Sequence, residues 1–258
     1  ASDVYKRQVK IVDIGHDNFD SACEALELGS VDMAVVDMAQ LIRMEKNDEN
    51  LPYGVVISGV LKRGDSRYVM IRKRHAKDLI ENAVVATDSY SKTERIKHMY
   101  DGISCVVETD IRKCIEKLDA SECDAVFVLL EDIKAARLHN SFLYRYTIMD
   151  YGECVPVHGE GVYAMLTKGK KEAVRTAREL SHKSTAECFE IEDDIISRVM
   201  QNVYVKTCDV YARISSDRLE IYADVTGNRG RIRVNERGTF VNKNLIITKI
   251  VDRISKSM

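Results

Sequence analysis

The sequence predicts an α/β protein with a small C-terminal α+β unit, and two observations lead to this prediction. Up to Leu166, strand-length apolar runs alternate with helical patterns, as in parallel sheets joined by right-handed crossovers. From Tyr204 onward, strands follow one another through Gly-containing turns and a helix closes the chain, which is typical of a small sheet with helices on one face.

The first block should contain four strands and one helix. In chain order they are Val9–Ile14, the helix Ser21–Leu28 ending at Gly29, Val31–Val36, Val55–Leu61 and Tyr68–Ile71. The continuous apolar run Val31–Val36 predicts a buried strand of a mainly parallel sheet. Gly64-Asp65-Ser66 is expected to form the turn between the last two strands.

The second block repeats strand and helix three times. The expected elements are Ala83–Thr87, Lys92–Tyr100, Ser104–Glu108, Asp110–Leu118 with Asp110 as its cap, Asp124–Leu130 and Asp132–Leu138. A loop from Pro156 to Gly161 then leads to a strand, Val162–Leu166.

The third block begins with two helices, Lys171–Leu180 and Thr185–Asn202. On the second helix an apolar stripe indicates packing against a core, and it comprises Cys188, Ile191, Ile195, Val199 and Val203. Three strands and a last helix follow, at Tyr211–Ile214, Leu219–Val225, Gly230–Asn235 and Asn244–Ser257.

Composition limits the possible functions. The 258 residues, 45% of them hydrophobic, suffice for one large domain or two to three small ones. Because 39 basic residues nearly balance 41 acidic ones, nothing in the charge favours nucleic acid or a membrane surface as a partner. Apolar runs are only strand-sized, so we expect no membrane span. Seven cysteines without a CxxC pair predict unpaired thiols, mostly buried, in a reducing cytosol.

The first eight residues, Ala1–Gln8, lack an initiator methionine and resemble translated adapter sequence. We therefore expect the chain to lack its native N-terminus. His158 is interpreted as a turn residue rather than a zinc ligand, because no second ligand stands at metal spacing. The basic hairpin Arg229–Arg233 is interpreted as a solvated strand edge rather than an RNA site.

Several stretches from about residue 9 to the C-terminus resemble, in order and spacing, the motifs of one family. These stretches are Val31–Met38, Leu61–Arg67 (similar to R-x-D-P-R-D), Ala86–Ser89 (G-T-S-S), Asp110–Leu118 with Cys123–Ala125, Val155–Gly161 (P-A-x-G-Q-G) and Thr185–Glu192 (T-A-x-x-x-x-x-E). The family is hydroxymethylbilane synthase, also called porphobilinogen deaminase.

This resemblance implies a fold and a reaction. The fold is two periplasmic-binding-protein-like α/β domains, 9–80 with 160–178 and 82–157, followed by an α+β domain, 180–258, that anchors the cofactor. The reaction joins four porphobilinogen molecules, with release of ammonia, on a dipyrromethane primer held by a cysteine. It needs a carboxylate to stabilise a cationic intermediate, a thiolate to anchor the primer, and arginines to hold carboxylate arms.

The same resemblance assigns site positions. The catalytic aspartate falls on Gln40 and the preceding lysine on Ala39, with Asp37 as a possible substitute. The primer cysteine falls on Tyr204, or on Val203 with one gap placed differently, and Cys208 is a possible substitute that alternation places in a strand.

The positions of the carboxylate-holding groups are altered too. The arginines fall on Ser91, Lys92, Glu108 and Cys114, and the loop glutamine is Glu160. Thr87, Ser89 and Lys92 remain as anion-binding groups of a strand-to-helix loop, with ordinary helix capping as the alternative.

Three readings stay open. The chain is a transferase of tetrapyrrole biosynthesis, a non-catalytic paralogue that binds a small anionic molecule in the inter-domain cleft, or a protein drifting without selection. The partner expected is porphobilinogen or a related pyrrole carboxylate, without covalently attached dipyrromethane. We expect a cytoplasmic monomer.

Overall fold

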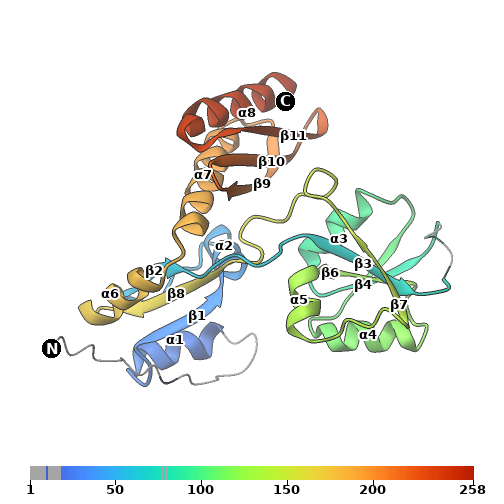
Figure 1. Cartoon of the computed structure of the whole chain (residues 1–258), viewed down its shortest axis with the longest axis horizontal. Helices are drawn as coiled ribbons and strands as arrows, with labels where there is room; N and C mark the ends of the chain where they lie inside the picture. Colours follow the sequence, from blue (N-terminus) through green and yellow to red (C-terminus); the bar gives the residue numbers. More distant parts are fainter. Residues whose placement is uncertain (1–9, 11–18, 77, 79–80) are drawn as a thin grey trace.

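The computed structural model describes residues 10, 19–76, 78 and 81–258, which form three sheets, each with its own helices (Figure 1). Two α/β lobes lie side by side, and a third unit stands above the junction between them. The expected α/β class with a small α+β unit is therefore confirmed. Apart from Lys10, the expected strand Val9–Ile14 lies outside the described residues, as do Ala1–Gln8.

The first lobe has a three-stranded antiparallel sheet in the order β1-β8-β2. Its elements are α1 (Phe19–Glu27), β1 (Met33–Asp37), α2 (Met38–Lys46), β2 (Val55–Val60), β8 (Tyr163–Lys168) and α6 (Lys171–Leu180). The prediction that Val31–Val36 forms a buried strand of a mainly parallel sheet is wrong. Within the described chain β1 pairs only with β8, antiparallel, and Val35 is 50% exposed.

The second lobe is built on a five-stranded mixed sheet in the order β5-β4-β6-β3-β7. Its elements are β3 (Tyr68–Lys73), β4 (Val84–Thr87), α3 (Tyr90–Lys97), β5 (Ser104–Val107), α4 (Ile111–Asp119), β6 (Ala125–Leu129), α5 (Leu130–Ala135) and β7 (Tyr144–Ile148). The strands β5, β4 and β6 are parallel, as the spacing predicts, and the Asp110 carboxylate caps α4 by accepting from Arg112 N at 2.8 Å. The antiparallel strand β7 was not predicted.

Two segments cross between the lobes, residues 61–67 and 149–162. They run side by side, because Leu61 N donates to Tyr163 O and Gly64 N donates to Gly161 O. Gly64-Asp65-Ser66 is thus part of a crossover and not the expected turn, since β2 and β3 belong to different sheets. The sequence-based bounds put β3 in the first domain (9–80), but it pairs in the second sheet, so the chain changes lobe before residue 80.

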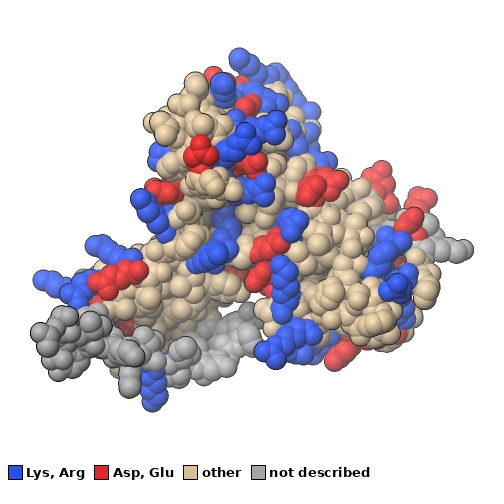
Figure 2. All heavy atoms as spheres, in the orientation of Figure 1, with Lys and Arg blue, Asp and Glu red and all other residues tan. Residues whose placement is uncertain are grey.

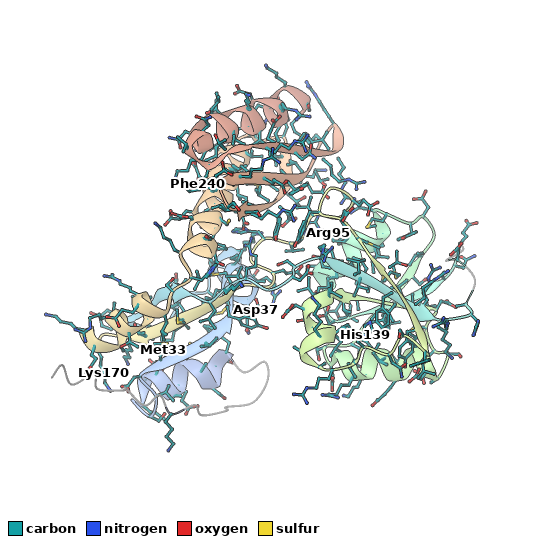
Figure 3. The ribbon with its side chains drawn as sticks, viewed as in Figure 1. Met33, Asp37, Arg95, His139, Lys170 and Phe240 are labelled. Atoms are coloured by element: carbon teal, nitrogen blue, oxygen red, sulfur yellow. The ribbon has the colours of Figure 1, made fainter. Side chains whose placement is uncertain are left out.

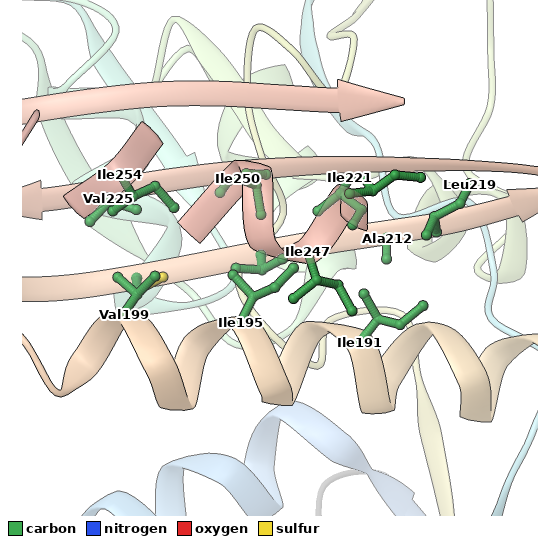
Figure 4. Close-up of a cluster of buried hydrophobic side chains, with 14 of the residues drawn as sticks. Ile191, Ile195, Val199, Ala212, Leu219, Ile221, Val225, Ile247, Ile250 and Ile254 are labelled. Carbon is green, nitrogen blue, oxygen red and sulfur yellow. The ribbon is translucent and has the colours of Figure 1, made fainter. Parts of the chain in front are cut away.

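The third unit is an antiparallel sheet, β11-β10-β9, with two helices on one face (Figure 4). Its elements are α7 (Lys183–Met200), β9 (Val205–Ser215), β10 (Arg218–Gly227), β11 (Gly230–Thr239), the 3₁₀ turn η1 (Phe240–Asn242) and α8 (Lys243–Ser257). Ile191, Ile195 and Val199 of the predicted stripe are buried against this sheet. Val203 is the exception, because it follows the end of α7 and is 85% exposed.

The seven cysteines are free, and six of them are buried, as predicted. In the part of the chain that the structure describes, no helix has both the length and the apolar character to span a bilayer.

Candidate functional site

The junction between the lobes gathers charged side chains from five parts of the chain. We call Asp37, Asp88, Lys92, Asp132 and Glu160 the cleft cluster. They come from the end of β1, the loop after β4, α3, α5 and the second crossover. Figure 3 shows Asp37 at the edge of the first lobe facing the second, and Figure 2 shows acidic atoms where the two lobes meet.

Lys92 lies at the centre of this cluster. Its side chain is 5% exposed, and its Nζ lies 2.6 and 2.7 Å from the two Asp88 carboxylate oxygens and 3.9 Å from Glu160 Oε1. Burial alone would lower the pKa of this ammonium, but Glu160 and Asp88 outweigh burial and raise it. Lys92 therefore stays charged, and its charge is already paired within the protein.

The carboxyl groups repel one another and resist ionisation. Burial raises the pKa of Glu160 to about 7, against the effect of Lys92 and of the Tyr68 hydroxyl, which donates to Glu160 Oε2. Burial raises the pKa of Asp132 to about 6, and the charges of Asp88 and Asp37 add to the shift. At neutral pH the cluster still holds more negative than positive charge, an environment that repels anions.

Two glycines in the second crossover hold Glu160 in place. Gly159 has φ +86°, and a Cβ there would lie 2.6 Å from Ile42 Cδ1. Gly161 has φ +72°, and a Cβ there would lie 2.5 Å from Ser66 Oγ. Both positions need a residue without a side chain, so the crossover loop can approach α2 and the first crossover closely.

Asp37 is engaged in the fold. It is the N-cap of α2, and its Oδ1 accepts from Ala39 N at 2.7 Å. Burial raises its pKa, while this backbone bond and the positive charges of Arg43 and Lys92 lower it. Gln40 lies in the first turn of α2, half-buried, where an amide supplies no negative charge.

The loop between β4 and α3 positions the remaining predicted binding residues. The Thr87 side chain is buried, and its Oγ1 has no hydrogen-bond partner among the described residues. Ser89 is the N-cap residue of α3 but makes no capping bond; its Oγ instead lies 3.1 Å from Ser91 Oγ. Ordinary side-chain capping therefore does not explain Ser89.

The two candidates for the primer position lie elsewhere. Tyr204 lies between α7 and β9 and is 55% exposed. Cys208 is a strand residue of β9, as alternation predicts, and packs in the core of the third unit. Burial raises the pKa of its thiol to about 12, so it holds almost no thiolate at neutral pH.

A buried ion pair joins the first crossover to α7. Arg63 Nη1 and Nη2 lie 2.6 and 2.8 Å from the two Glu192 carboxylate oxygens, and Ala212 N donates to Glu192 Oε1 at 2.7 Å. Burial alone would raise the pKa of Glu192, but Arg63 holds it below its ordinary value. His158 lies in a turn, as predicted, and it also joins this pair, because its Nδ1 lies 3.4 Å from Glu192 Oε2.

A second buried network joins the second lobe to the third unit. Arg95 of α3 binds Asp224 at 2.9 Å and also Asp209, and Arg231 of the predicted basic hairpin binds Asp224 from the other side. Arg231 is therefore only partly a solvated edge residue. The sequence analysis did not identify Arg95 as a functional or structural residue. Its position next to the apolar Ile96 on a short helix was a weak indication that its side chain is buried.

This arrangement gathers four carboxyl groups around one ammonium group, so it favours a positively charged group over a negatively charged one. Within the described residues no group of three His, Cys, Asp or Glu side chains is placed to hold a metal ion. The cluster offers carboxylates to a cationic group, and the α3 N-terminus offers backbone N–H groups to an anionic one.

Comparisons with known proteins agree on one family. Residues 7–176 match the family model "Porphobilinogen deaminase, dipyromethane cofactor binding domain". The porphobilinogen deaminase of Clostridium acetobutylicum is 22% identical over 218 residues, which cover 79% of this chain and 74% of that protein. That of Chlorobium luteolum is 24% identical over 192 residues, covering 73% of this chain and 60% of that protein.

Solved structures show weaker likeness. An ABC transporter from Parabacteroides distasonis has a TM-score of 0.45 at 16% identity, over 73% of this chain and 63% of that one. The periplasmic VFT2 domain of Bordetella pertussis BvgS has a TM-score of 0.41 at 16% identity, over 62% and 65% of the two chains. Since the family model covers more than half of the sequence, this chain belongs to the porphobilinogen deaminase family.

Proposed function

We propose that this chain is a non-catalytic member of the porphobilinogen deaminase family that binds a small aminomethyl-pyrrole carboxylate in the cleft between its α/β lobes. The observation that carries the proposal is the pairing of Lys92. The ammonium at an arginine position of the family is neutralised by Asp88 and Glu160 and is not free for a ligand's carboxylate arms.

The positions assigned to catalysis support the same proposal. Gln40 cannot provide the negative charge that a cationic intermediate needs. Tyr204 has no thiol, and the Cys208 thiol is buried with a pKa of about 12. These residues do not fit covalently attached dipyrromethane, so we derive no step through that group.

The charge of the cleft cluster defines the ligand more narrowly than the sequence does. A purely anionic ligand would meet more negative than positive charge. Porphobilinogen carries an aminomethyl ammonium besides its two carboxylates, and the ammonium fits the cluster. Its carboxylates fit the N-terminus of α3, where Ser89 makes no capping bond.

The test is binding rather than turnover. Porphobilinogen should raise the melting temperature of the protein, and the increase should grow with the logarithm of the ligand concentration above Kd, because the ligand binds only the folded state. The analogue with a methyl group in place of the aminomethyl group should bind at least tenfold more weakly. Equal binding of the two compounds, or none of either, would contradict the proposal.

Asp132→Asn supplies the matched variant. It removes a carboxylate that repels its neighbours, so the folded state should be kept, and the ammonium should bind severalfold more weakly. Glu116→Gln on the exposed face of α4 removes the same charge far from the cluster and should leave binding unchanged.

The family reaction is the second candidate, and Asp37 is the observation in its favour. It is a carboxylate at the exposed end of β1, three residues before Gln40, and the charge of Lys92 acts on it. If Asp37 replaces the family aspartate, the protein should consume porphobilinogen and Asp37→Asn should abolish that consumption. A wild-type protein that leaves porphobilinogen unchanged eliminates this candidate.

A further inference from the structure

A cavity lies outside the cleft cluster, where the first lobe meets the third unit. Its volume is about 460 Å³, within the range of small-molecule sites. The walls come from α2, the connection from α2 to β2, β2 itself and α7. The lining residues are Met38, Leu41, Ile42, Met44, Glu45, Glu49, Asn50, Leu51, Ile57, Phe189 and Asp193. We call it the α2–α7 pocket.

The lining combines an apolar wall with acidic groups. Seven of these residues are apolar, and three carry carboxylates: Glu45, Glu49 and Asp193. No lysine, arginine or histidine is among the lining residues. Asp193 is partly neutralised, because its Oδ1 lies 2.8 Å from His158 Nε2. Glu45 and Glu49 form no ion pair with any residue that the structure describes, so their charge is available to a ligand.

We propose that the α2–α7 pocket binds a small amphipathic cation, an apolar body that carries one ammonium group. The apolar wall favours burial of hydrocarbon, because this removes apolar surface from water on both partners. The carboxylates of Glu45 and Glu49 attract a positively charged ligand and repel a negatively charged one, so a cation should bind more tightly than a neutral molecule of the same shape. The proposal is independent of the function proposed for the cleft.

Three probes of one shape separate charge from hydrophobicity. They are 4-phenylbutylamine, 4-phenylbutanol and 4-phenylbutyrate, all small enough for the cavity. At the affinity per atom usual for such ligands, the amine should bind with a Kd on the order of a millimolar. Titration to roughly ten times that Kd therefore nearly saturates the site.

Methionine methyl NMR locates the binding site in the intact chain. Met38 and Met44 line the pocket, whereas Met70 is buried in the second lobe. With ¹³C-methyl methionine, the amine should shift the signals of Met38 and Met44 and leave that of Met70 in place. The alcohol should bind more weakly and the carboxylate should produce no shift.

Two variants test the carboxylates and the cavity separately. The double variant Glu45→Gln, Glu49→Gln should weaken amine binding about fivefold, since each exposed charge contributes modestly. Ile57→Trp should abolish binding by filling the cavity, and Ile57 is 47% exposed, so a larger side chain does not disturb the core. Glu116→Gln is the charge control, and Asp132→Asn is the control for the cleft cluster; both should leave amine binding unchanged.

Any of four results would overturn the proposal. The first is equal shifts of Met38 and Met44 with amine and carboxylate, and the second is no shift with the amine at the highest concentration. The third is unchanged amine affinity in the double glutamine variant. Loss of amine binding in Asp132→Asn would place the amine in the cleft and would also reject the pocket as its site.

Discussion

The imidazole of His158 should make the protein less stable as the pH rises above neutrality. His158 is 5% exposed, its Nε2 lies 2.8 Å from Asp193 Oδ1, and its Nδ1 lies 3.4 Å from Glu192 Oε2. Its ring stacks on that of Phe189 with 4.7 Å between centroids. Burial alone would lower its pKa, but the two carboxylates outweigh burial and raise it from 6.5 to about 9.

The sign and size follow from this shift. A group whose pKa is raised in the folded state adds stability below its unfolded pKa and loses it as the pH rises toward the folded pKa. A shift from 6.5 to about 9 corresponds to about 3 kcal/mol in total, of which about 2 kcal/mol disappears between pH 7 and 8.5.

Other groups limit the useful pH window. Glu160 and Asp132 have pKa values raised to about 7 and about 6, so they also make stability fall with pH, mainly below neutrality. Buried thiols such as Cys208 act in the same direction as the pH approaches their ordinary value of 9.0. His158 is therefore the largest single contribution between pH 7 and 8.5, and comparison with a variant that lacks the imidazole separates its share from that of the thiols and Glu160.

Urea unfolding at several pH values measures this directly. The free energy of unfolding of the wild type should fall by at least about 2 kcal/mol from pH 7 to 8.5. His158→Gln keeps an amide donor for Asp193 but does not titrate, so its free energy of unfolding should fall by about 2 kcal/mol less than that of the wild type over the same range. Parallel slopes in the two proteins would refute the assignment of a protonated His158.

Three further results are expected. Arg63→Met should lower the free energy of unfolding by about 3–5 kcal/mol in urea titration, because it leaves Glu192 buried without its main partner; a loss under 1 kcal/mol would contradict a buried pair. Ile195→Ala should cost about 2–5 kcal/mol in the same titration, since Ile195 is fully buried in the third unit (Figure 4), and a smaller loss would mean a looser core. In native protein treated with iodoacetamide and digested, mass spectrometry should find Cys105, which is half-buried, labelled before Cys208; the reverse order would contradict the burial of Cys208.

Most elements of the fold could be predicted because each depends on local pattern. The helix at α6 has the predicted bounds, Lys171–Leu180, and the Asp110 cap forms as expected. The local sequence pattern does not determine which strands pair when they are far apart in the sequence. The apolar run at β1 is also compatible with an antiparallel strand, and β3 has the same sequence character in either lobe.

The resemblance pointed to some members of the cleft cluster, but the charge balance of the cluster could not be predicted from the sequence. Resemblance placed Lys92 and Glu160 at functional positions, and both lie in the cleft cluster. Asp88 pairs with Lys92 and Asp132 comes from a separate helix, and only the folded chain brings these charges together. Similarly, Arg95 and Asp224 stand 129 positions apart in the sequence, so no local pattern could have predicted their contact.

The central claim is that this family member does not perform the family reaction, and the state of the purified protein tests it most directly. The mass of the intact, denatured protein should equal that of the unmodified chain, and incubation with porphobilinogen should leave the pyrrole unconsumed. A covalently added dipyrromethane mass, together with consumption of porphobilinogen and formation of a linear tetrapyrrole, would contradict the account.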